Sequence, residues 1–357
     1  MVITVALAAT YGLWVLFTGS PALPSYSADD DQVRIDVLRL VFYAVAGIGG
    51  VVALTIAYRR QRLHEAAERR DDTRLFNERF TAAAEQLASE QAANRLAGVY
   101  TMARLADDWN VERQTCVDVL CAYLRMPYDP PRLRKKPTDE EVKEYKQVRQ
   151  EQQVRHAILD VIAERLCAEP VEGKTWHWCD FNFMGATLDD INFANATFFG
   201  DVLFNGASFP EGHIYLGGVK FHDGVGFHKS KFNGGFVDFS GVEFKGQVTT
   251  FALAQFTDGT VIFHGASFDF EINNFVSSDF TGGRVEFGEA GRGFKTLFRS
   301  GRVDFEGVCF EGAEVDFRGV EFGPAIVDMR KVADWSVPPT FDEFPDGPPD
   351  GLLLPTR

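Results

Sequence analysis

Residues 225–268 read VGFHKSKFNGGFVDFSGVEFKGQVTTFALAQFTDGTVIFHGASF. Phenylalanine recurs in this stretch at alternating steps of five and seven residues, and a small or β-branched residue lies two positions before each one. Side chains at positions i−2 and i point to the same face of an extended segment. The stretch therefore predicts short extended sides whose inward residues are Phe227, Phe232, Phe239, Phe244, Phe251, Phe256, Phe263 and Phe268, each with the residue two before it.

The same pattern continues on both sides of this stretch. It begins at Phe183 with steps of five, slips by one residue after Phe198, and ends at Met329. Glycine often follows two positions after the phenylalanine, and glycine tolerates the positive φ of a sharp turn. Repeated sides and corners predict a solenoid whose coils stack at about 4.8 Å. The further inward residues expected are Leu188, Ile191, Phe193, Ala196, Ala207, Phe209, Ile214, Leu216, Val219, Phe221, Asn273, Phe275, Ser278, Phe280, Val285, Phe287, Val303, Phe305, Val308, Phe310, Val315, Phe317, Val320, Phe322 and Val327.

Over residues 178–330 the sequence resembles the pentapeptide-repeat family, whose motif centres on a Leu or Phe that follows a small and a polar residue. The resemblance implies a right-handed, four-sided β-helix for residues 171–330, with the phenylalanines and the residues two before them inside. The seven-residue step departs from the family motif and gives a 12-residue half-coil. We expect the four-sided coil to persist with bulged edges, followed by a Pro-rich C-terminal tail over residues 331–357.

An interruption separates Phe287 from Phe305. Residues 288–304 break the spacing of the phenylalanines and concentrate positive charge. We interpret them as a basic loop that leaves one corner of the solenoid, or alternatively as a contact for a partner. The basic side chains are Arg292, Lys295, Arg299 and Arg302.

The N-terminal residues 1–58 contain two apolar segments, Val2–Phe17 and Leu40–Tyr58. The second has 19 uncharged residues, which as a helix would span roughly 28 Å, close to the hydrocarbon core of a bilayer. Arginines follow it at once, whereas the loop between the segments carries an acidic triplet. This pattern predicts two transmembrane helices that form a hairpin in the cell (plasma) membrane, a multi-pass topology with both termini in the cytoplasm. An open alternative makes residues 1–22 a cleavable signal peptide.

Small residues lie four positions apart in both apolar segments. The pairs are Ala8 with Gly12 and Ala46 with Gly50. This spacing lets helices approach closely. It would serve the packing of the hairpin or a homodimer equally well.

Residues 59–170 predict an α-helical module that starts with a charged juxtamembrane helix. Helices are expected to Leu87 with an apolar stripe from Phe76, over Ala93–Leu105, from Asn110 to Met126, and from a capping box at Thr138 and Glu141 to about Cys167. A proline-rich basic linker, residues 127–137, precedes the last of them. The segment 95–125 looks like a single armadillo- or HEAT-like hairpin, which either packs on its neighbours or docks a partner.

The search for chemistry predicts no catalytic, cofactor-binding or metal-binding residue, and so no enzyme and no cofactor. Asp189 and Asp190 form a lone acidic pair that we expect to be solvated. His177 and Cys179 are two possible ligands, but a structural zinc site needs four. The five cysteines predict free, mostly buried thiols in a reducing compartment. They are Cys116, Cys121, Cys167, Cys179 and Cys309.

Negative charge is concentrated in the C-terminal part. Residues 171–357 carry 14 basic and 27 acidic side chains, a net −13 of the total −15. Direct nucleic-acid binding is therefore not expected. The carboxylates that precede inward phenylalanines should face outward in rows, which serve solubility or a basic partner. These residues are Asp238, Glu243, Asp279, Glu286, Asp304, Asp316, Glu321 and Asp328.

Together these features predict a non-catalytic scaffold that contacts the lipid bilayer through residues 1–58 and presents an acidic β-solenoid in the cytoplasm to an unidentified, possibly basic protein. The alternative is a DNA-mimic regulator of a topoisomerase or another basic protein, as the resemblance to some cytoplasmic pentapeptide-repeat proteins implies. The N-terminal hairpin and the helical pattern also resemble membrane-anchored family members of high-GC, actinobacterial-type bacteria.

Overall fold

The computed structural model covers a chain of 357 residues. It divides into two compact units, residues 1–75 and 76–357, which are treated separately. The structure describes Ala8, Tyr11, Gly12, Val15, Pro21 and residues 31–132, 134–135, 137–288 and 295–356, without the side chains of residues 31–38, 41, 42, 45, 247 and 270–273.

Helix α2 (Asp31–Leu87) starts in the first unit and contains the second apolar segment. Most of the first segment, Val2–Phe17, lies outside the described residues. Among the residues that are described, no helix combines the length and the apolarity that a membrane span requires. The fold itself therefore gives the predicted transmembrane hairpin no support.

The second unit begins with the end of α2 and three further helices, α3 (Ala92–Asp108), α4 (Arg113–Leu124) and α5 (Asp139–Leu166). The predicted apolar stripe is confirmed, because Phe76, Ala83 and Leu87 are buried. Helices α3 and α4 pack against each other and against α5. The segment 95–125 thus packs on its neighbours, as the simpler of the two alternatives required.

The predicted capping box of α5 is confirmed. The backbone N–H of Glu141 donates to Thr138 Oγ1 at 3.2 Å, and the backbone N–H of Thr138 donates to Glu141 Oε2 at 2.8 Å. These two bonds satisfy N–H groups that the start of a helix otherwise leaves unpaired.

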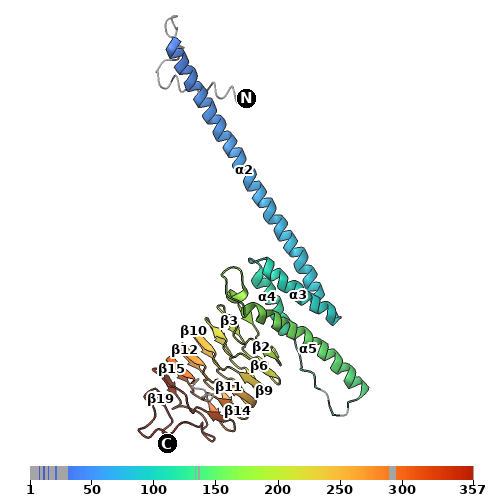
Figure 1. The fold of residues 1–357 in the computed structure, drawn as a ribbon, viewed down its shortest axis with the longest axis vertical. Coiled ribbons are helices and arrows are strands. Elements are labelled where there is room, and N and C mark those ends of the chain that lie inside the picture. The colour runs from blue at the N-terminus through green and yellow to red at the C-terminus, as the bar shows by residue number, and fades with distance from the viewer. Residues whose placement is uncertain are drawn as a thin grey trace. The chain divides into compact units, whose positions relative to one another are not determined.

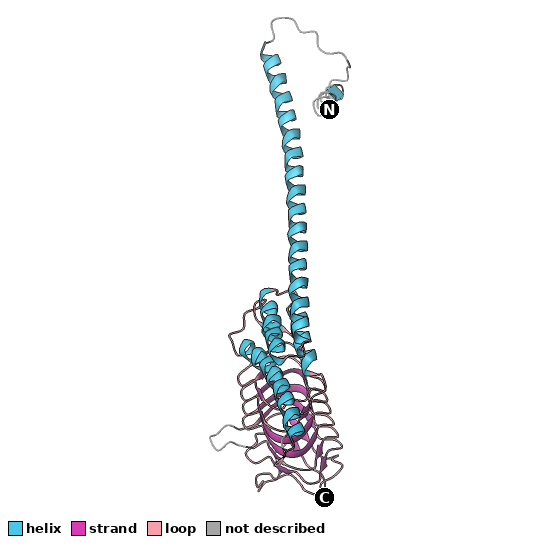
Figure 2. Cartoon of the chain, turned by 90° about the vertical axis from the view of Figure 1, so that its right-hand side faces the viewer, coloured by secondary structure: helices cyan, strands magenta, loops and turns pink. Residues whose placement is uncertain are grey.

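After a 3-10 turn, η1 (Trp176–Trp178), the chain winds into a β-solenoid of parallel strands (Figures 1 and 2). Two sheets form its walls, and α4 and α5 contact its first strands, β1 and β2. The strands are β1 (Phe181–Asn182), β2 (Ile191–Asn192), β3 (Thr197–Phe198), β4 (Val202–Leu203), β5 (Ser208–Phe209), β6 (His213–Tyr215), β7 (Lys220–Phe221), β8 (Val225–Gly226), β9 (Lys231–Asp238), β10 (Glu243–Thr250), β11 (Gln255–Ile262), β12 (Ser267–Asn274), β13 (Asp279–Phe280), β14 (Arg284–Glu286), β15 (Leu297–Asp304), β16 (Cys309–Phe310), β17 (Glu314–Asp316), β18 (Ile326–Asp328) and β19 (Leu352–Leu353).

Strand register fixes the length of a coil. Phe198 pairs with Phe221, Phe221 with Phe244, and Phe244 with Phe268. The differences between these positions give coils of 23, 23 and 24 residues. A coil of 24 residues equals two of the half-coils of 12 that the alternating steps of five and seven predict.

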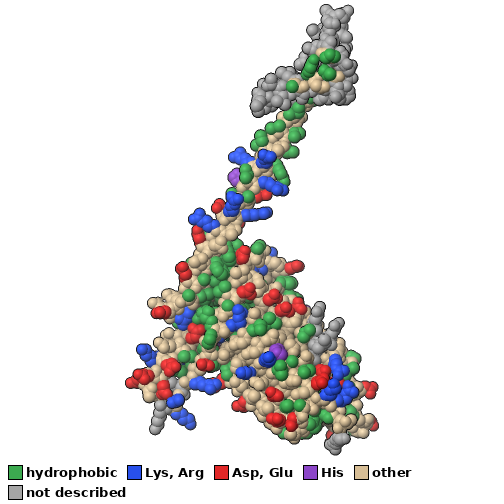
Figure 3. All heavy atoms as spheres, turned by 180° about the vertical axis from the view of Figure 1, so that it is seen from behind, with side chains coloured by type: hydrophobic (Ala, Val, Ile, Leu, Met, Phe, Trp, Pro, Cys, Tyr) green, Lys and Arg blue, Asp and Glu red, His purple; other side chains and the backbone are tan. Residues whose placement is uncertain are grey.

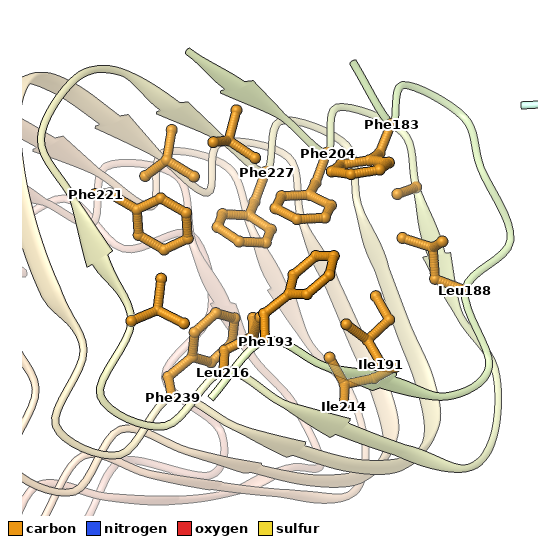
Figure 4. Packing of buried hydrophobic residues seen from close by; sticks show 14 of the residues in the cluster. Phe183, Leu188, Ile191, Phe193, Phe204, Ile214, Leu216, Phe221, Phe227 and Phe239 are labelled. Atoms are coloured by element: carbon orange, nitrogen blue, oxygen red, sulfur yellow. The ribbon is translucent and has the colours of Figure 1, made fainter. Parts of the chain in front are cut away.

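Four columns of buried side chains fill the solenoid, one for each side of the coil. Phe183, Phe204 and Phe227 begin one column, with ring centroids 5.1 and 4.9 Å apart (Figure 4). The others run through Phe209, Phe232 and Phe256, through Phe239, Phe263 and Phe287, and through Phe198, Phe221 and Phe244. The four-sided coil is therefore confirmed, and the seven-residue steps leave the columns unbroken.

One step of the repeat was missed in the sequence. The apparent slip between Phe198 and Phe209 contains a complete inward pair, because Val202 and Phe204 are both buried. Phe204 follows Phe198 by six residues, a step that the pattern of fives and sevens does not include.

The predicted loop over residues 288–304 is wrong in its extent. Strand β15 occupies its second half, and Thr296 and Phe298 are fully buried there. Phe298 stacks on Phe268 at 5.0 Å and continues its column. Arg299 and Arg302 consequently belong to a strand, Lys295 directly precedes it, and Arg292 lies outside the described residues.

Residues of the predicted C-terminal tail pack on the last coil. The Trp335 ring lies 5.5 Å from that of Phe310, and the Phe341 ring lies 5.4 Å from that of Phe317. Strand β19 pairs with β18. Despite its prolines, this segment extends the ring columns and the sheet.

Candidate interaction surface

Side chains of the helical module cover the N-terminal edge of the solenoid. Gln114 on α4 both donates to the carbonyl of Asp180 and accepts from its N–H, each at 2.9 Å. Arg125 donates to the carbonyl of Asn182 at 2.8 Å. Backbone groups at the edge of a parallel sheet would otherwise offer a template for another strand. The module therefore protects this end of the solenoid from aggregation.

Asp189 is the centre of this junction, contrary to the expectation that it is solvated. Its side chain is buried and accepts hydrogen bonds from Tyr128 Oη at 2.9 Å and Gln152 Nε2 at 2.5 Å. His156 Nε2 lies 3.3 Å from the other carboxylate oxygen. The expectation was wrong because the sequence did not show that α5 packs over this corner, whereas the adjacent Asp190 is exposed as expected.

Two pKa shifts follow from these contacts. Burial alone would raise the pKa of Asp189, but the hydrogen bonds from His156, Gln152 and Tyr128 outweigh it and lower the pKa. The hydrogen bond with Asp189 raises the pKa of His156 above its ordinary value of 6.5, against the opposing effect of burial. Both shifts favour the ion pair.

Arg155 is a second buried charge in the junction that sequence reasoning missed. Its guanidinium lies 4.4 Å from the centre of the Tyr128 ring and donates to the carbonyls of Leu124 and, at 3.3 Å, Tyr123. Glu151 lies 3.9 Å away and provides the opposite charge. A long arginine in an i, i+4 pair with an acid on a polar helix carries no sequence signal that distinguishes it from a solvated one.

The outward acidic residues have a structural task at the corners of the coil. Asp238 Oδ1 accepts the backbone N–H of Ser240 at 2.8 Å, two positions later. Asp304, Asp316 and Asp328 make the same bond to the residue two after each. An Asp that bonds the backbone in this way stabilises a turn. Half of the eight residues in the predicted rows therefore hold corners.

Several of these carboxylates are also neutralised by arginine. Asp328 is buried and lies 2.6 Å from both Arg302 and Arg330. The hydrogen bond from Arg330, which exceeds the opposing effect of burial, lowers the pKa of Asp328 to about 2. Asp316 pairs with Arg318 at 2.6 Å. On the face seen in Figure 3, acidic and basic side chains lie next to one another and do not form a single acidic field.

A shallow, polar depression of about 420 Å³ lies on the solenoid wall formed by β11, β14 and β17. Glu286 is its central group, with Arg284 Nε at 2.5 Å and His264 Nε2 at 2.8 Å. Its other charged lining residues are Asp316, Arg318 and Asp342. Because the charges are paired with one another, the depression has no excess charge with which to attract an ion.

The thiols are free, and three of the five are buried, as predicted for most of them. Burial raises the pKa of Cys116 and of Cys121 to about 12 and that of Cys179 to about 11. These three are therefore packing residues. Within the described residues, no group of three or more potential ligands could hold a metal ion.

The comparisons agree with the repeat pattern. Residues 183–231 match the family model described as pentapeptide repeats (9 copies). The resemblance is thereby confirmed for this stretch. The match does not extend to the helices, so it gives no support for the membrane-anchored, actinobacterial type. Neither the curated proteins nor the solved structures yielded a match to the chain.

Proposed function

We propose that this protein is a non-catalytic interaction scaffold, attached to the plasma membrane by its N-terminal segment and presenting the solenoid to a protein partner in the cytoplasm. The observation that carries the proposal is the filled interior. Four columns of stacked rings occupy the space inside the coils, so the solenoid offers its outer walls for binding. Solenoids commonly bind partners through such extended surfaces.

Attachment to the membrane is supported by the sequence and by exposed side chains. Leu40–Tyr58 is an uncharged run of 19 residues, and it lies within α2. The side chains of Leu40, Val51 and Leu54 are 72, 66 and 74 % exposed. A helix that is apolar all round needs a lipid or protein environment. Three residues of this run, 41, 42 and 45, have side chains outside the described set, so the search for a span did not cover the whole run.

The DNA-mimic alternative is less favoured by the arrangement of charge. A mimic must present a continuous negative surface. Asp316, Asp328 and Glu286 are each paired with an arginine, and others hold corners. The net charge of −13 over residues 171–357 still favours a basic partner over an acidic one.

A membrane test uses the full chain and one pair of variants. We expect the chain to float with lipid vesicles, and the double variant Val51→Asp, Leu54→Asp to remain soluble, because buried charge is costly in the bilayer. The control Leu63→Asp, on an exposed site beyond the run, should still float. Equal flotation of all three would overturn membrane attachment through Leu40–Tyr58. A cysteine introduced at Ser27 should be labelled from outside intact cells, and protection there would refute the topology.

A second test addresses the scaffold. A biotin ligase fused to the full chain should label proteins that the same ligase fused to residues 1–75 does not label. A purified protein from this set should then bind the purified chain and remain chemically unchanged. Failure to enrich any protein, or turnover of a substrate by the chain, would contradict a scaffold role.

A further inference from the structure

Three aromatic side chains form an exposed cluster on the wall of the solenoid. His213 and Tyr215 lie on β6, and Phe236 lies on the adjacent strand β9. The ring centroids of His213 and Tyr215 are 5.7 Å apart, and each lies 6.3 Å from that of Phe236. We call these three residues the aromatic cluster.

The strands themselves force the cluster outward. Ile214 and Val237 are the neighbours that point inward, and each is 1 % exposed. Because side chains alternate along a strand, the residues on either side of them face solvent. Tyr215 is 40 % exposed, which is unusual for an aromatic residue in a fold that buries its other rings in columns.

Two carboxylates border the cluster. Asp190 accepts the backbone N–H of His213 at 2.9 Å, and Asp238 is the strand partner of Tyr215. Among the described residues, the ion pairs include none with Asp190 or Asp238. The faces of aromatic rings and nearby carboxylates both attract a cation.

The chain shows elsewhere what such a site holds. An arginine lies over the ring of Tyr58, Trp109, Tyr128 and Trp176, at 4.4 to 5.3 Å from the ring centre. In the described part of the chain, no cation lies over His213, Tyr215 or Phe236 in this way. The cluster thus has the rings and the negative charge of these sites without their arginine.

We propose that the aromatic cluster docks an arginine side chain from a basic segment of the protein partner. The inference rests on the proposed scaffold function and assigns it a place on the surface. Arginine fits better than lysine because its planar guanidinium stacks on an aromatic face while it donates to carboxylates. Asp190 and Asp238 would supply the acceptors.

The test measures the fluorescence anisotropy of a labelled peptide with four Arg-Gly units, titrated with the full chain in detergent. A lysine peptide of equal charge and an uncharged citrulline peptide serve as comparisons. We expect the arginine peptide to bind about three- to tenfold more tightly than the lysine peptide. The citrulline peptide should bind more weakly than either.

Matched variants separate the cluster from the overall negative charge. Tyr215→Ala with Phe236→Ala keeps every charge and should reduce the affinity for the arginine peptide to that for the lysine peptide. Asp190→Asn with Asp238→Asn keeps the acceptors for the backbone bonds and should weaken both charged peptides. The control Tyr100→Ala, which removes another exposed ring on α3, should change nothing. Melting temperatures of all variants establish that they fold.

Equal affinities for the arginine and lysine peptides, or no effect of the ring substitutions, would overturn the proposal. Binding of phosphocholine that is lost with the rings would also overturn it, in favour of a lipid headgroup. If partners found by proximity labelling still bind the Tyr215→Ala, Phe236→Ala variant with unchanged affinity, the docking site is wrong while the scaffold function stands.

Discussion

At Gly259 the chain passes close to the coil before it. The residue has φ +80°, and a Cβ placed there would lie 2.5 Å from the carbonyl oxygen of Gly235. Gly185 has a similar φ of +69°, but a Cβ there would meet nothing within 4 Å. The two positions separate the cost of backbone conformation from the cost of contact between coils.

We therefore expect Gly259→Ala to destabilise the solenoid by at least about 3 kcal/mol, because a left-handed residue costs about 1–2 kcal/mol and the contact adds to it. Gly185→Ala should cost only about 1–2 kcal/mol. Thermal unfolding followed by circular dichroism compares the two. Similar melting temperatures for both variants would mean that the coils can separate locally at Gly259.

His156 and Asp189 predict a pH dependence of the junction between helices and solenoid. The raised pKa of His156 contributes stability that is fully present below its ordinary value of 6.5 and is lost as the pH rises through the folded value. The lowered pKa of Asp189 contributes stability above its ordinary 3.8, which is lost as the pH falls through the folded value. The ion pair is therefore strongest between about pH 4 and pH 6.5.

The variant His156→Gln retains a donor for Asp189 but does not titrate. We expect the melting temperature of the unmodified chain to fall between pH 6 and pH 8.5 relative to that of the variant. Parallel curves over this range would show that His156 does not couple the helices to the solenoid. Asp190 and Asp160 also act on His156, so Asp190→Asn is the control, with a smaller effect.

At the scale of elements, what could be predicted depended on whether the signal was local. The capping box at Thr138 and the inward pairs of β9, β10 and β11 involve residues a few positions apart, and all were predicted from the sequence. Phe298 escaped detection because its inward partner is the polar Thr296, whose hydroxyl is satisfied only in the fold, by the carbonyl of Phe263 at 2.6 Å. Asp189 escaped for the same reason, since its three partners lie 33 to 61 positions away.

The candidate surface shows the same limit. Alternation correctly placed the carboxylates before the phenylalanines on the outside, but not their bonds to the corners or to arginine. His213 and Phe236 are 23 positions apart, and only the coil length brings them to adjacent strands. A correct coil length would have been enough to align them, whereas the repeat was counted in half-coils.

A single column tests how the rings stabilise the element they form. Phe263 stacks between Phe239 at 4.8 Å and Phe287 at 4.7 Å. Phe263→Ala should cost about 3–5 kcal/mol through the cavity it leaves. Phe263→Leu should cost far less, because Leu216 occupies the same column one coil before Phe239 and is fully buried. Melting temperatures provide the comparison, and equal losses for both variants would argue that ring stacking rather than filled volume stabilises the column.

At the scale of the whole molecule, each coil contacts its neighbours through the same register. A chain of this kind behaves nearly as a one-dimensional array, in which stability is a sum over coils and their interfaces. Phe244 lies over Phe268 and Glu243 pairs with Ser267, 24 positions apart. Removing one whole coil should therefore leave two surfaces that still fit.

Deletion of residues 244–267 joins Glu243 to Phe268 and restores the step of five after Phe239. We expect this shortened chain to fold, with the strand signal in its circular dichroism spectrum reduced and its melting temperature within a few degrees of the original. Deletion of residues 244–263 removes fewer residues but places Phe268 nine positions after Phe239, so that it no longer meets a column. This second chain should lose its cooperative transition and become sensitive to protease. The array would be refuted if the smaller deletion were tolerated as well as the larger one, because stability would then not depend on the coil as the unit of packing.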